Sequence, residues 1–592
     1  MSHYKDYMPP YHLDVAPKDS YRSVYRWGDP TFNKIPKEGL YKLIKKTFNL
    51  TDDDFKKPAE MGLEKVDFDI PRTLTDLQVN EFKAIVGKEN VGEDCYSRIT
   101  ASYGKTMLDM LRLRKGIVEN VPDIVLYPST TEEIVKIVDI CKRDKISIYV
   151  CSGGSSVTRG FEAMKKGAIC LDFRRNFNKM VKFNEVNQTI TVQSGMTGPN
   201  LEKLLNNAPS TLGAKCRYTC GHFPQSFEFS SVGGWAITRG AGQNSTYYGK
   251  MEDLVICQKY VTPVGIIETD PVPRKACGPS IDQIMMGSEG AFGILCEVTI
   301  KLFHFHPEDR QRFCYIFKSF EEGQKAMREV MQGEFGVPSA FRLSDEEETS
   351  FMLHLYGVEE GGLNGLLSTF GYKPMQRCLM IGFNDGDIGL QKLINRRVHR
   401  IVKRHGAMRM PSVVTSEWEK GRFNDPYMRD CIQDFGIIID TLELAVDWDR
   451  MPEVYKSVRA FCKSRPNTIV TTHISHCYQQ GANLYFIFSI NTRDIKEFSD
   501  YHSGILDAIQ KSGACMSHHH GIGKLFAPWL EGQLGKNEYE ILKTLKKHFD
   551  PDNLMNPGGT IGLDMPKDKI IAKDEKFKPS ANVDYIHNYI DK

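Results

Sequence analysis

Three consecutive histidines, His518, His519 and His520, stand directly before Gly-Ile-Gly-Lys at residues 521–524. Imidazoles can donate to an anion, move protons near neutral pH or bind a metal. Because neighbouring side chains point in different directions on a helix or strand, three adjacent histidines cannot reach one ion from one face. The run therefore suits one or two donors to an anionic substrate better than a metal site. Alternatively, the three histidines have no functional role and are either exposed to solvent or hydrogen-bonded within the core.

Two further residues have the chemistry of an active site, and each also has a simpler explanation. Arg429 could bind a phosphate with its planar fork, but Asp425 and Asp430 lie close by, so a surface ion pair explains it equally well. Tyr485 could transfer a proton, but it lies in the apolar run Leu484–Ile487, where a core tyrosine is expected. Residue type alone leaves both alternatives open.

Three loops of small residues fall within one region, at Ser152–Thr158, Ser230–Trp235 and Gly287–Gly293. Glycine after a strand lets backbone N–H groups approach a pyrophosphate, and serine adds donors. A tight turn explains any one of these loops, but three together favour a dinucleotide. None fits the G-x-G-x-x-G pattern that opens a helix, so a nicotinamide-binding Rossmann domain is not predicted.

The elements around the first loop form a strand-helix-strand unit. Residues 124–127 predict a buried strand, residues 129–132 a capping box with a helix after it, and residues 146–150 a second strand that runs into the loop. Short alternating strands follow up to about residue 303. Helical periodicity from about residue 78 to 113 predicts a helical extension before this region, and we find no chemistry in it.

Composition excludes several classes of protein. The chain has 592 residues, with 77 Lys+Arg against 75 Asp+Glu and 41% hydrophobic residues, which is typical of a globular protein rather than a polybasic nucleic-acid binder or a disordered scaffold. No run approaches the roughly 18 apolar residues of a membrane-spanning helix, and no apolar signal segment follows the N-terminus. We therefore expect a soluble chain that no signal peptide exports.

The 15 cysteines are scattered, many of them in apolar runs, which indicates buried, reduced thiols in an intracellular compartment. Cys216, Cys220 and His222 come nearest to a metal pattern but lack the paired spacing of a zinc site, so we expect them to be structural. Shifts in composition divide the chain into an N-terminal extension (1–117), a cofactor domain (118–303), a second domain (304–505) and a C-terminal segment (506–592).

Residues 122–128, the small-residue loop, Val232–Gly234 and Gly287–Gly290 together resemble the FAD-binding domain of the vanillyl-alcohol oxidase / p-cresol methylhydroxylase flavoprotein superfamily. The resemblance implies an α+β fold in which a two-subdomain FAD-binding domain carries a cap domain and helical N- and C-terminal extensions. Within that superfamily, residues 228–235, 427–430 and 517–524 are similar to the alkyldihydroxyacetonephosphate synthase (alkylglycerone-phosphate synthase) family. The triple histidine is the most specific of these motifs.

The resemblance also implies a set of site residues. Expected FAD contacts are Val150, Cys151, Ser152, Gly153, Gly154, Ser155 and Ser156; Gln225, Ser226, Phe227, Glu228, Phe229, Ser230 and Ser231; Thr238, Arg239, Gly240 and Ala241; and Gly287, Ser288, Glu289, Gly290, Ala291, Phe292 and Gly293. Tyr485, His518, His519 and His520 are the expected catalytic residues, Arg429 is expected to bind the substrate, and no metal is implied. Ser152 stands where many relatives have glycine, but its N–H remains available.

The implied activity is FAD-dependent ether-lipid synthesis. The acyl group of 1-acyl-dihydroxyacetone phosphate is exchanged for a long-chain fatty alcohol through a flavin N5 adduct, without net redox change. We expect noncovalent FAD, because residues 150–160 hold no histidine and Cys151 is their only thiol. The family further implies a homodimer, peripheral membrane association, dihydroxyacetone-phosphate acyltransferase as a partner and no nucleic acid.

The family also implies the lumenal face of a peroxisome or glycosome membrane. The two ends of the sequence match the known targeting signals for that compartment poorly. The chain ends at Ile590–Lys592, which does not resemble Ser-Lys-Leu, and Lys5 to Leu13 has the outline of the second peroxisomal signal with an unsuitable Asp6.

The main alternative is an FAD-dependent D-2-hydroxyacid dehydrogenase of the same superfamily. Those enzymes hold a divalent metal with a Glu-His pair and a Gly-Asn-Leu-His segment, whereas this chain has His519-His520 and Asn483-Leu484-Tyr485. Losing the carboxylate and a histidine together removes the ligands that such a metal needs. Asn556-Pro557-Gly558, however, looks more like these dehydrogenases. A catalytically silent scaffold on a membrane, lacking the yellow of flavin, is a third hypothesis.

Overall fold

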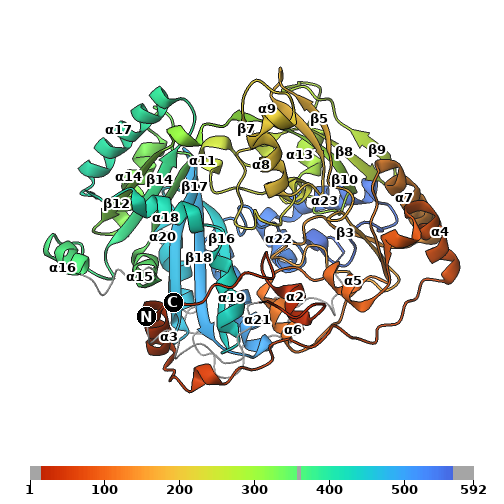
Figure 1. Ribbon diagram of the computed structural model, residues 1–592, viewed down its shortest axis with the longest axis horizontal. Coiled ribbons are helices and arrows are strands. Elements are labelled where there is room, and N and C mark those ends of the chain that lie inside the picture. Colours follow the sequence, from red (N-terminus) through yellow and green to blue (C-terminus); the bar gives the residue numbers. More distant parts are fainter. Residues whose placement is uncertain (1–14, 356–361, 565–592) are drawn as a thin grey trace.

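The computed structural model describes residues 15–355 and 362–564 (Figure 1). The motifs at residues 5–13 and 590–592 lie outside these ranges. Figure 1 shows two lobes: a sheet within residues 311–491, called the cap below, fills one side with its helices, and the sheets of residues 91–301 fill the other. Among the described helices, none combines the length and apolar character needed to cross a membrane.

A four-stranded sheet of order β1-β2-β4-β3 carries the first glycine-rich loop. Its elements are β1 (Val91–Gly92), β2 (Ile124–Leu126), α7 (Thr131–Asp144), β3 (Ile148–Cys151) and β4 (Ile169–Asp172). The predicted strand-helix-strand unit is confirmed, but β4 lies between its two strands and pairs in parallel with both. The capping box uses Thr130 and Glu133, one residue later than predicted.

A five-stranded antiparallel sheet of order β5-β6-β10-β8-β9 completes this half. Its strands are β5 (Met180–Asn184), β6 (Thr189–Gln193), β8 (Val255–Thr262), β9 (Gly265–Glu268) and β10 (Ile294–Lys301), and a two-stranded sheet joins β7 (Tyr218–Thr219) to β11 (Phe303–His304). Its helices are α8 (Gly198–Asn206), α9 (Ala208–Thr211), α10 (Val232–Ile237), α11 (Ser245–Tyr248), α12 (Met251–Leu254) and α13 (Ile281–Met285). Strands β8 and β9 form an antiparallel hairpin.

The cap is a seven-stranded antiparallel sheet of order β15-β12-β14-β13-β17-β18-β16. Its strands are β12 (Gln311–Phe317), β13 (Ala340–Ser344), β14 (Cys378–Asn384), β15 (Met408–Arg409), β16 (Ile437–Asp447), β17 (Ile469–Cys477) and β18 (Gly481–Asn491). Its helices are α14 (Phe320–Met331), α15 (Glu346–Leu355), α16 (Gly362–Thr369), α17 (Ile388–Arg404), α18 (Val413–Gly421), α19 (Met428–Gln433), α20 (Met451–Ser464) and α21 (Ile495–Lys511). The expected domain boundary at residue 505 falls inside helix α21.

The N-terminal helix Glu38–Phe48 packs against the cap, whereas the C-terminal segment returns to the cofactor half. The N-terminal elements are α2 (Tyr21–Tyr25), α3 (Glu38–Phe48), α4 (Asp76–Val86), α5 (Cys95–Thr100) and α6 (Met107–Arg114), so the helical periodicity from residue 78 to 113 belongs to three helices. The C-terminal ones are α22 (Ala527–Leu534) and α23 (Lys536–Phe549). After α23, Leu554 accepts a hydrogen bond from the Ile148 N–H at 2.7 Å, which ties the C-terminal segment to β3.

Candidate active site

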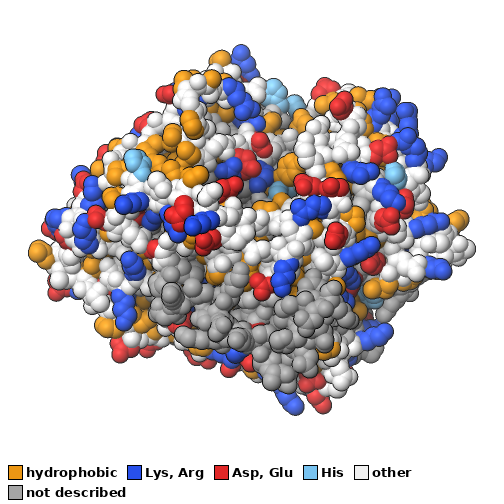
Figure 2. Space-filling model, turned by 180° about the vertical axis from the view of Figure 1, so that it is seen from behind, with side chains coloured by type: hydrophobic (Ala, Val, Ile, Leu, Met, Phe, Trp, Pro, Cys, Tyr) orange, Lys and Arg blue, Asp and Glu red, His pale blue; other side chains and the backbone are white. Residues whose placement is uncertain are grey.

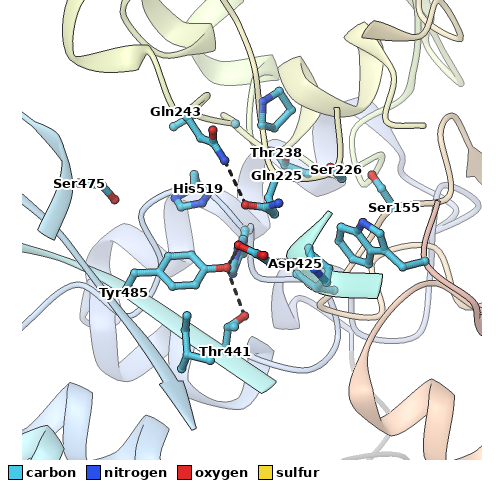
Figure 3. Close-up of a pocket in the computed structure, with 18 of the residues that line it drawn as sticks. Ser155, Gln225, Ser226, Thr238, Gln243, Asp425, Thr441, Ser475, Tyr485 and His519 are labelled. Carbon is cyan, nitrogen blue, oxygen red and sulfur yellow. Dashed lines mark hydrogen bonds between the residues drawn. The ribbon is translucent and has the colours of Figure 1, made fainter. Parts of the chain in front are cut away.

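A cavity of about 350 Å³ lies between the cofactor half and the cap sheet. The small-residue loop after β3 lines one end, and strands β16, β17 and β18 line the other. Figure 3 shows Ser155, Gln225 and Ser226 on the cofactor side and Tyr485, Thr441 and His519 on the cap side. Residues far apart in the sequence thus line one cavity.

Strand alternation decides which cap residues face this cavity. The register pairs Glu443, Tyr485 and His473 in one row across β16, β18 and β17, then Thr441, Ile487 and Thr471, then Ile439, Ser489 and Ile469. Eight of these nine residues line the cavity, and Glu443 is buried beneath the histidine loop. The residues between them, such as Leu484, Phe486 and Phe488, pack into the core on the other face. The cavity wall therefore changes from polar to mainly apolar along the strands.

The cofactor end has the shape that a pyrophosphate needs. A Cβ on Gly153 would lie 2.8 Å from the Ser231 nitrogen, and Gly154 has a φ of +72°, so both positions require glycine. The hydroxyl of Ser152 lies 2.9 Å from the Ser194 carbonyl and 2.7 Å from the Ser231 hydroxyl, which ties the two loops together. Serine at residue 152 is thus explained by a structural contact. The residues present fit FAD.

The structure divides the expected FAD contacts into two groups. Those that line the cavity are Val150, Ser152, Gly153, Gly154, Ser155, Ser156, Gln225, Ser226, Thr238, Gly240, Ala241 and Glu289. Those outside its lining, although within the described chain, are Cys151, Phe227, Glu228, Phe229, Ser230, Ser231, Arg239, Gly287, Ser288, Gly290, Ala291, Phe292 and Gly293. Two of the second group have other partners: Arg239 donates to Gln283 at 2.9 Å, and Glu228 accepts from the Tyr427 hydroxyl at 2.8 Å.

His222 is a cavity residue to which sequence analysis gave a structural role. Its ring packs on Trp235 with centroids 4.6 Å apart, and neither ring nitrogen has a hydrogen-bond partner among the described residues. Burial lowers the pKa of His222 to about 3, so the imidazole is neutral. A neutral, unpartnered imidazole in this wall is suited to hydrogen-bond a bound cofactor.

The triple histidine is held by a buried carboxylate that the sequence did not suggest. Glu443 accepts hydrogen bonds from the backbone N–H groups of His518, His519 and His520 at 2.8 to 3.0 Å, and from the Ser517 hydroxyl at 3.0 Å. Burial acts to raise the pKa of Glu443, but the neighbouring imidazoles overcome it and hold that pKa well below its ordinary value. Glu443 is therefore ionised, and its carboxylate holds the histidine loop in place.

Glu443, His518 and His519 also bring three atoms capable of binding a metal within 4.8 Å of one another. Both Glu443 oxygens already accept backbone N–H groups, and the Nδ1 atoms of His518 and His519 lie 3.1 Å apart. These contacts explain the cluster as hydrogen bonding within the loop. The absence of a metal stays a prediction.

A second buried carboxylate, Glu289, holds the other end of the histidine loop. It accepts from the Ile522 and Gly523 N–H groups at 2.6 Å each. Burial raises the pKa of Glu289 to about 7, against the opposing effect of these hydrogen bonds. The loop is thus fixed from both halves of the molecule, since Glu289 belongs to the cofactor half and Glu443 to the cap.

The three histidines do not have equivalent positions. His519 and His520 line the cavity, whereas His518 lies behind them, with its Nε2 atom 2.8 Å from the Tyr478 hydroxyl. The Tyr485 hydroxyl lies 3.4 Å from Nε2 of His520 and donates to the Thr441 hydroxyl at 3.3 Å (Figure 3). Burial raises the pKa of Tyr485 to about 12, so it carries its proton at neutral pH. Burial lowers the pKa of His520 to about 4.

Arg429 faces the cavity because its acidic sequence neighbours bind elsewhere. Asp425 pairs with Lys34, and Asp430 binds Arg114 at 2.8 Å. Arg429 instead has Asp440 of β16 as its nearest carboxylate, at 3.5 Å, and its Nε and Nη2 atoms have no hydrogen-bond partner among the described residues. The surface ion pair is therefore not formed. A buried guanidinium with unsatisfied donors beside the cavity is suited to an anion.

The N-terminal extension positions the helix that carries Arg429. Arg22 of α2 donates to Asp434 at 3.0 and 3.1 Å, and Arg114 of α6 donates to the same carboxylate at 2.6 Å. Trp27, which follows α2, lines the cavity and lies under Arg429, 6.0 Å from ring centroid to guanidinium carbon. The extension thus belongs to the site, although sequence analysis found no chemistry in it. Arginines four residues apart beside a tryptophan were the available signal.

Comparisons with known proteins agree with this geometry. Residues 122–270 match the FAD binding domain family, and residues 306–560 match the C-terminal domain of FAD linked oxidases. The chain is 31% identical to the alkyldihydroxyacetonephosphate synthase of Caenorhabditis elegans, over 79% of this chain and 80% of that protein. It is 28% identical to the enzyme of that name from Dictyostelium discoideum, over 89% and 88%.

A solved structure of an alkyldihydroxyacetonephosphate synthase superposes with a TM-score of 0.76 at 26% identity, covering 89% of this chain and 93% of that one. The matches confirm FAD as the cofactor and the vanillyl-alcohol oxidase type of fold that the sequence predicted.

Proposed function

Because the chain belongs to the alkyldihydroxyacetonephosphate synthase family, we propose that it makes ether lipids with FAD. In the proposed reaction, 1-acyl-dihydroxyacetone phosphate exchanges its acyl group for a long-chain fatty alcohol and releases a fatty acid. The observation that carries the proposal is the division of the cavity wall into a polar row at Tyr485 and an apolar end at Ile439 and Ile469.

The apolar end of the cavity supports a substrate with a long alkyl chain. Beyond the polar row, Ile487 and Ile439 on the strands and Phe351 and Met352 of α15 line the cavity. Burying methylene groups there is favourable by about 0.8 kcal/mol each. A small hydroxyacid would leave this end unfilled.

The polar end supports a charged head group and proton transfer. Arg429 offers unsatisfied guanidinium donors to the phosphate, and Tyr485 offers its hydroxyl proton to the departing acyl group or to the dihydroxyacetone unit. The small-residue loop after β3 would hold FAD, which would supply a nucleophilic nitrogen for an exchange without net electron transfer. His520, which is neutral, keeps the Tyr485 hydroxyl in position from 3.4 Å.

The dehydrogenase alternative lacks its metal ligands here. Where those enzymes place a carboxylate, this chain has His519, and where they place the histidine of Gly-Asn-Leu-His, it has Tyr485. The nearby carboxylate Glu443 already accepts the backbone of the histidine loop. These substitutions favour the synthase.

The test supplies the purified holoenzyme with acyl-dihydroxyacetone phosphate and radiolabelled hexadecanol. We expect labelled alkyl-dihydroxyacetone phosphate and an equal amount of released fatty acid. Arg429→Lys should raise the KM for acyl-dihydroxyacetone phosphate, since a point charge cannot reproduce a bidentate contact. Dye reduction with D-lactate or another 2-hydroxyacid, with no labelled product, would instead establish the dehydrogenase.

A further inference from the structure

His473 is a cavity residue that neither the motifs nor the resemblance assigns. It lies directly opposite Tyr485 in the register of β17 and β18, and their rings stack with centroids 4.9 Å apart at 15°. Its side chain is buried at 5% exposure and lines the cavity. It therefore occupies the same polar row as the expected catalytic tyrosine.

Two charged residues of the cap fix the orientation of His473. Its Nδ1 atom lies 2.9 Å from Oε1 of Glu348 in α15, and Arg342 of β13 donates to the same oxygen at 2.8 Å. Burial acts to raise the pKa of Glu348, but Arg342 and His473 overcome it and lower that pKa to about 2. An ionised carboxylate can only accept, so Nδ1 of His473 carries the hydrogen.

The second ring nitrogen of His473 is available. Burial, with a further contribution from Arg342, lowers the pKa of His473, so the ring is neutral at physiological pH and Nε2 bears a lone pair. Among the described residues, Nε2 has no hydrogen-bond partner. The groups that face the ring are Arg342, Glu348 and Tyr485, from three different elements, and His519 of the histidine loop.

We propose that His473, oriented by Glu348, accepts the hydroxyl proton of the fatty alcohol when the ether bond forms. This inference rests on the proposed function. An alcohol with its chain along the apolar rows would bring its hydroxyl to the polar row, beside His473. Its oxygen forms the new bond to C1 of the dihydroxyacetone unit, the O–H bond breaks, and the proton passes to Nε2. The bond between C1 and the group that the alcohol replaces breaks, and that group leaves with the electron pair.

The other groups of this row are less suited to that step. Tyr485 is protonated at neutral pH, so it can give up a proton but cannot take one from the alcohol. His520 already faces the tyrosine hydroxyl, and His519 lies 3.4 Å from the Glu443 carboxylate. His473 combines a fixed hydrogen on one nitrogen with an unoccupied lone pair on the other, which is the arrangement of a general base.

The test separates the two half-reactions in His473→Gln. Rapid quenching without alcohol measures the release of fatty acid from acyl-dihydroxyacetone phosphate, and adding hexadecanol then measures ether formation. We expect fatty acid release within about twofold of wild type and ether formation slower by about a hundredfold, the scale for losing a general base. Glu348→Gln should slow ether formation alone by about tenfold. In His473→Ala, added imidazole should restore part of it.

A matched control is His399→Gln, which replaces a histidine of α17 whose Nδ1 lies 3.2 Å from the Tyr315 hydroxyl, outside the cavity lining. Both half-reactions should stay at wild-type rates in it. Flavin absorbance and thermal melting check that each variant is folded. Wild-type ether formation in His473→Gln, or equal slowing of both half-reactions, would overturn the inference. No alkyl product from the wild-type enzyme would instead reject the proposed function, and the inference with it.

Discussion

Tyr485 gives the sharpest prediction at the scale of single residues. Tyr485→Phe keeps the ring that stacks on His473 and removes the hydroxyl near His520. FAD binding should survive, and turnover should fall by about a hundredfold or more, the scale for losing a general acid or base. Flavin absorbance and the alkyl-product assay measure the two effects. Turnover within threefold of wild type would show that the hydroxyl takes no part.

His222 provides a second prediction at this scale. His222→Phe keeps an aromatic ring against Trp235 but deletes both unpartnered nitrogens. If these nitrogens bind the cofactor, FAD affinity should weaken by about fivefold, the worth of a typical hydrogen bond of about 1 kcal/mol. Titration of apoenzyme with FAD, followed by flavin fluorescence, measures this. Unchanged affinity would give His222 a packing role only.

Glu443 gives a prediction that depends on pH. Its folded pKa is depressed, so its contribution to stability is present above the unfolded pKa of about 4.3 and is lost as pH falls through the folded value. Glu443→Gln replaces one acceptor with an N–H group that faces backbone donors, and it should destabilise by about 1–3 kcal/mol at pH 7. Thermal melting from pH 3 to pH 8 should show this difference shrinking below about pH 4. A constant difference would contradict an ionised Glu443.

Motifs predicted some of these residues but could not predict others. Tyr485, Arg429 and the triple histidine belong to short runs that resemble a family. Glu443 and His473 belong to no such motif. They join the site only because the pairing of β16 and β17 with β18 places them on either side of Tyr485. That pairing joins residues up to 54 positions apart in sequence, such as Ile437 with Asn491, which no local spacing encodes.

At the scale of elements, helix α19 should depend on the N-terminal extension. Arg22→Met leaves Asp434 and Asp430 buried with fewer cations, and breaking a buried pair from one side costs about 3–5 kcal/mol. Because α19 carries Arg429, substrate binding should weaken as well. Thermal melting and the KM for acyl-dihydroxyacetone phosphate measure the two consequences.

The control for this prediction is Arg217→Met. Arg217 pairs with Glu308 at 2.6 Å, but both side chains are exposed, at 41% and 57%. Such a surface pair contributes about 0–1 kcal/mol. If Arg22→Met melts and binds substrate as the control does, α19 is held by other contacts.

Local signals predicted the elements better than their arrangement. The capped helix α7 and the strands on either side of it were clear from periodicity, because their apolar residues recur at the spacing of each element. That β4 would insert between β2 and β3 was not visible, since the sequence carries no record of strand order. The cavity arises from that order and from the docking of the cap.

At the scale of the whole molecule, the surface carries charges of both signs. Figure 2 shows acidic and basic side chains interspersed over one face, in keeping with the net charge of +2. At the end of β3, Cys151 is buried, and burial raises its pKa to about 12, so the thiol is protonated. A protonated thiol is a poor nucleophile.

We therefore predict noncovalent FAD. Acid precipitation should release the yellow colour into the supernatant. Colour that stays in the pellet of the wild type but not of His222→Phe would instead identify a covalent bond to His222, the histidine that lines the cofactor end.

The measurement that tests the central claim most directly counts products per flavin under anaerobic conditions. Purified holoenzyme receives acyl-dihydroxyacetone phosphate and fatty alcohol without any electron acceptor, and the flavin absorbance is followed throughout. An exchange without net redox change predicts many alkyl products per flavin, with the flavin fully oxidised when the substrate is spent. Product that stops at or below one per flavin, with the absorbance bleached to the reduced form, would contradict the account.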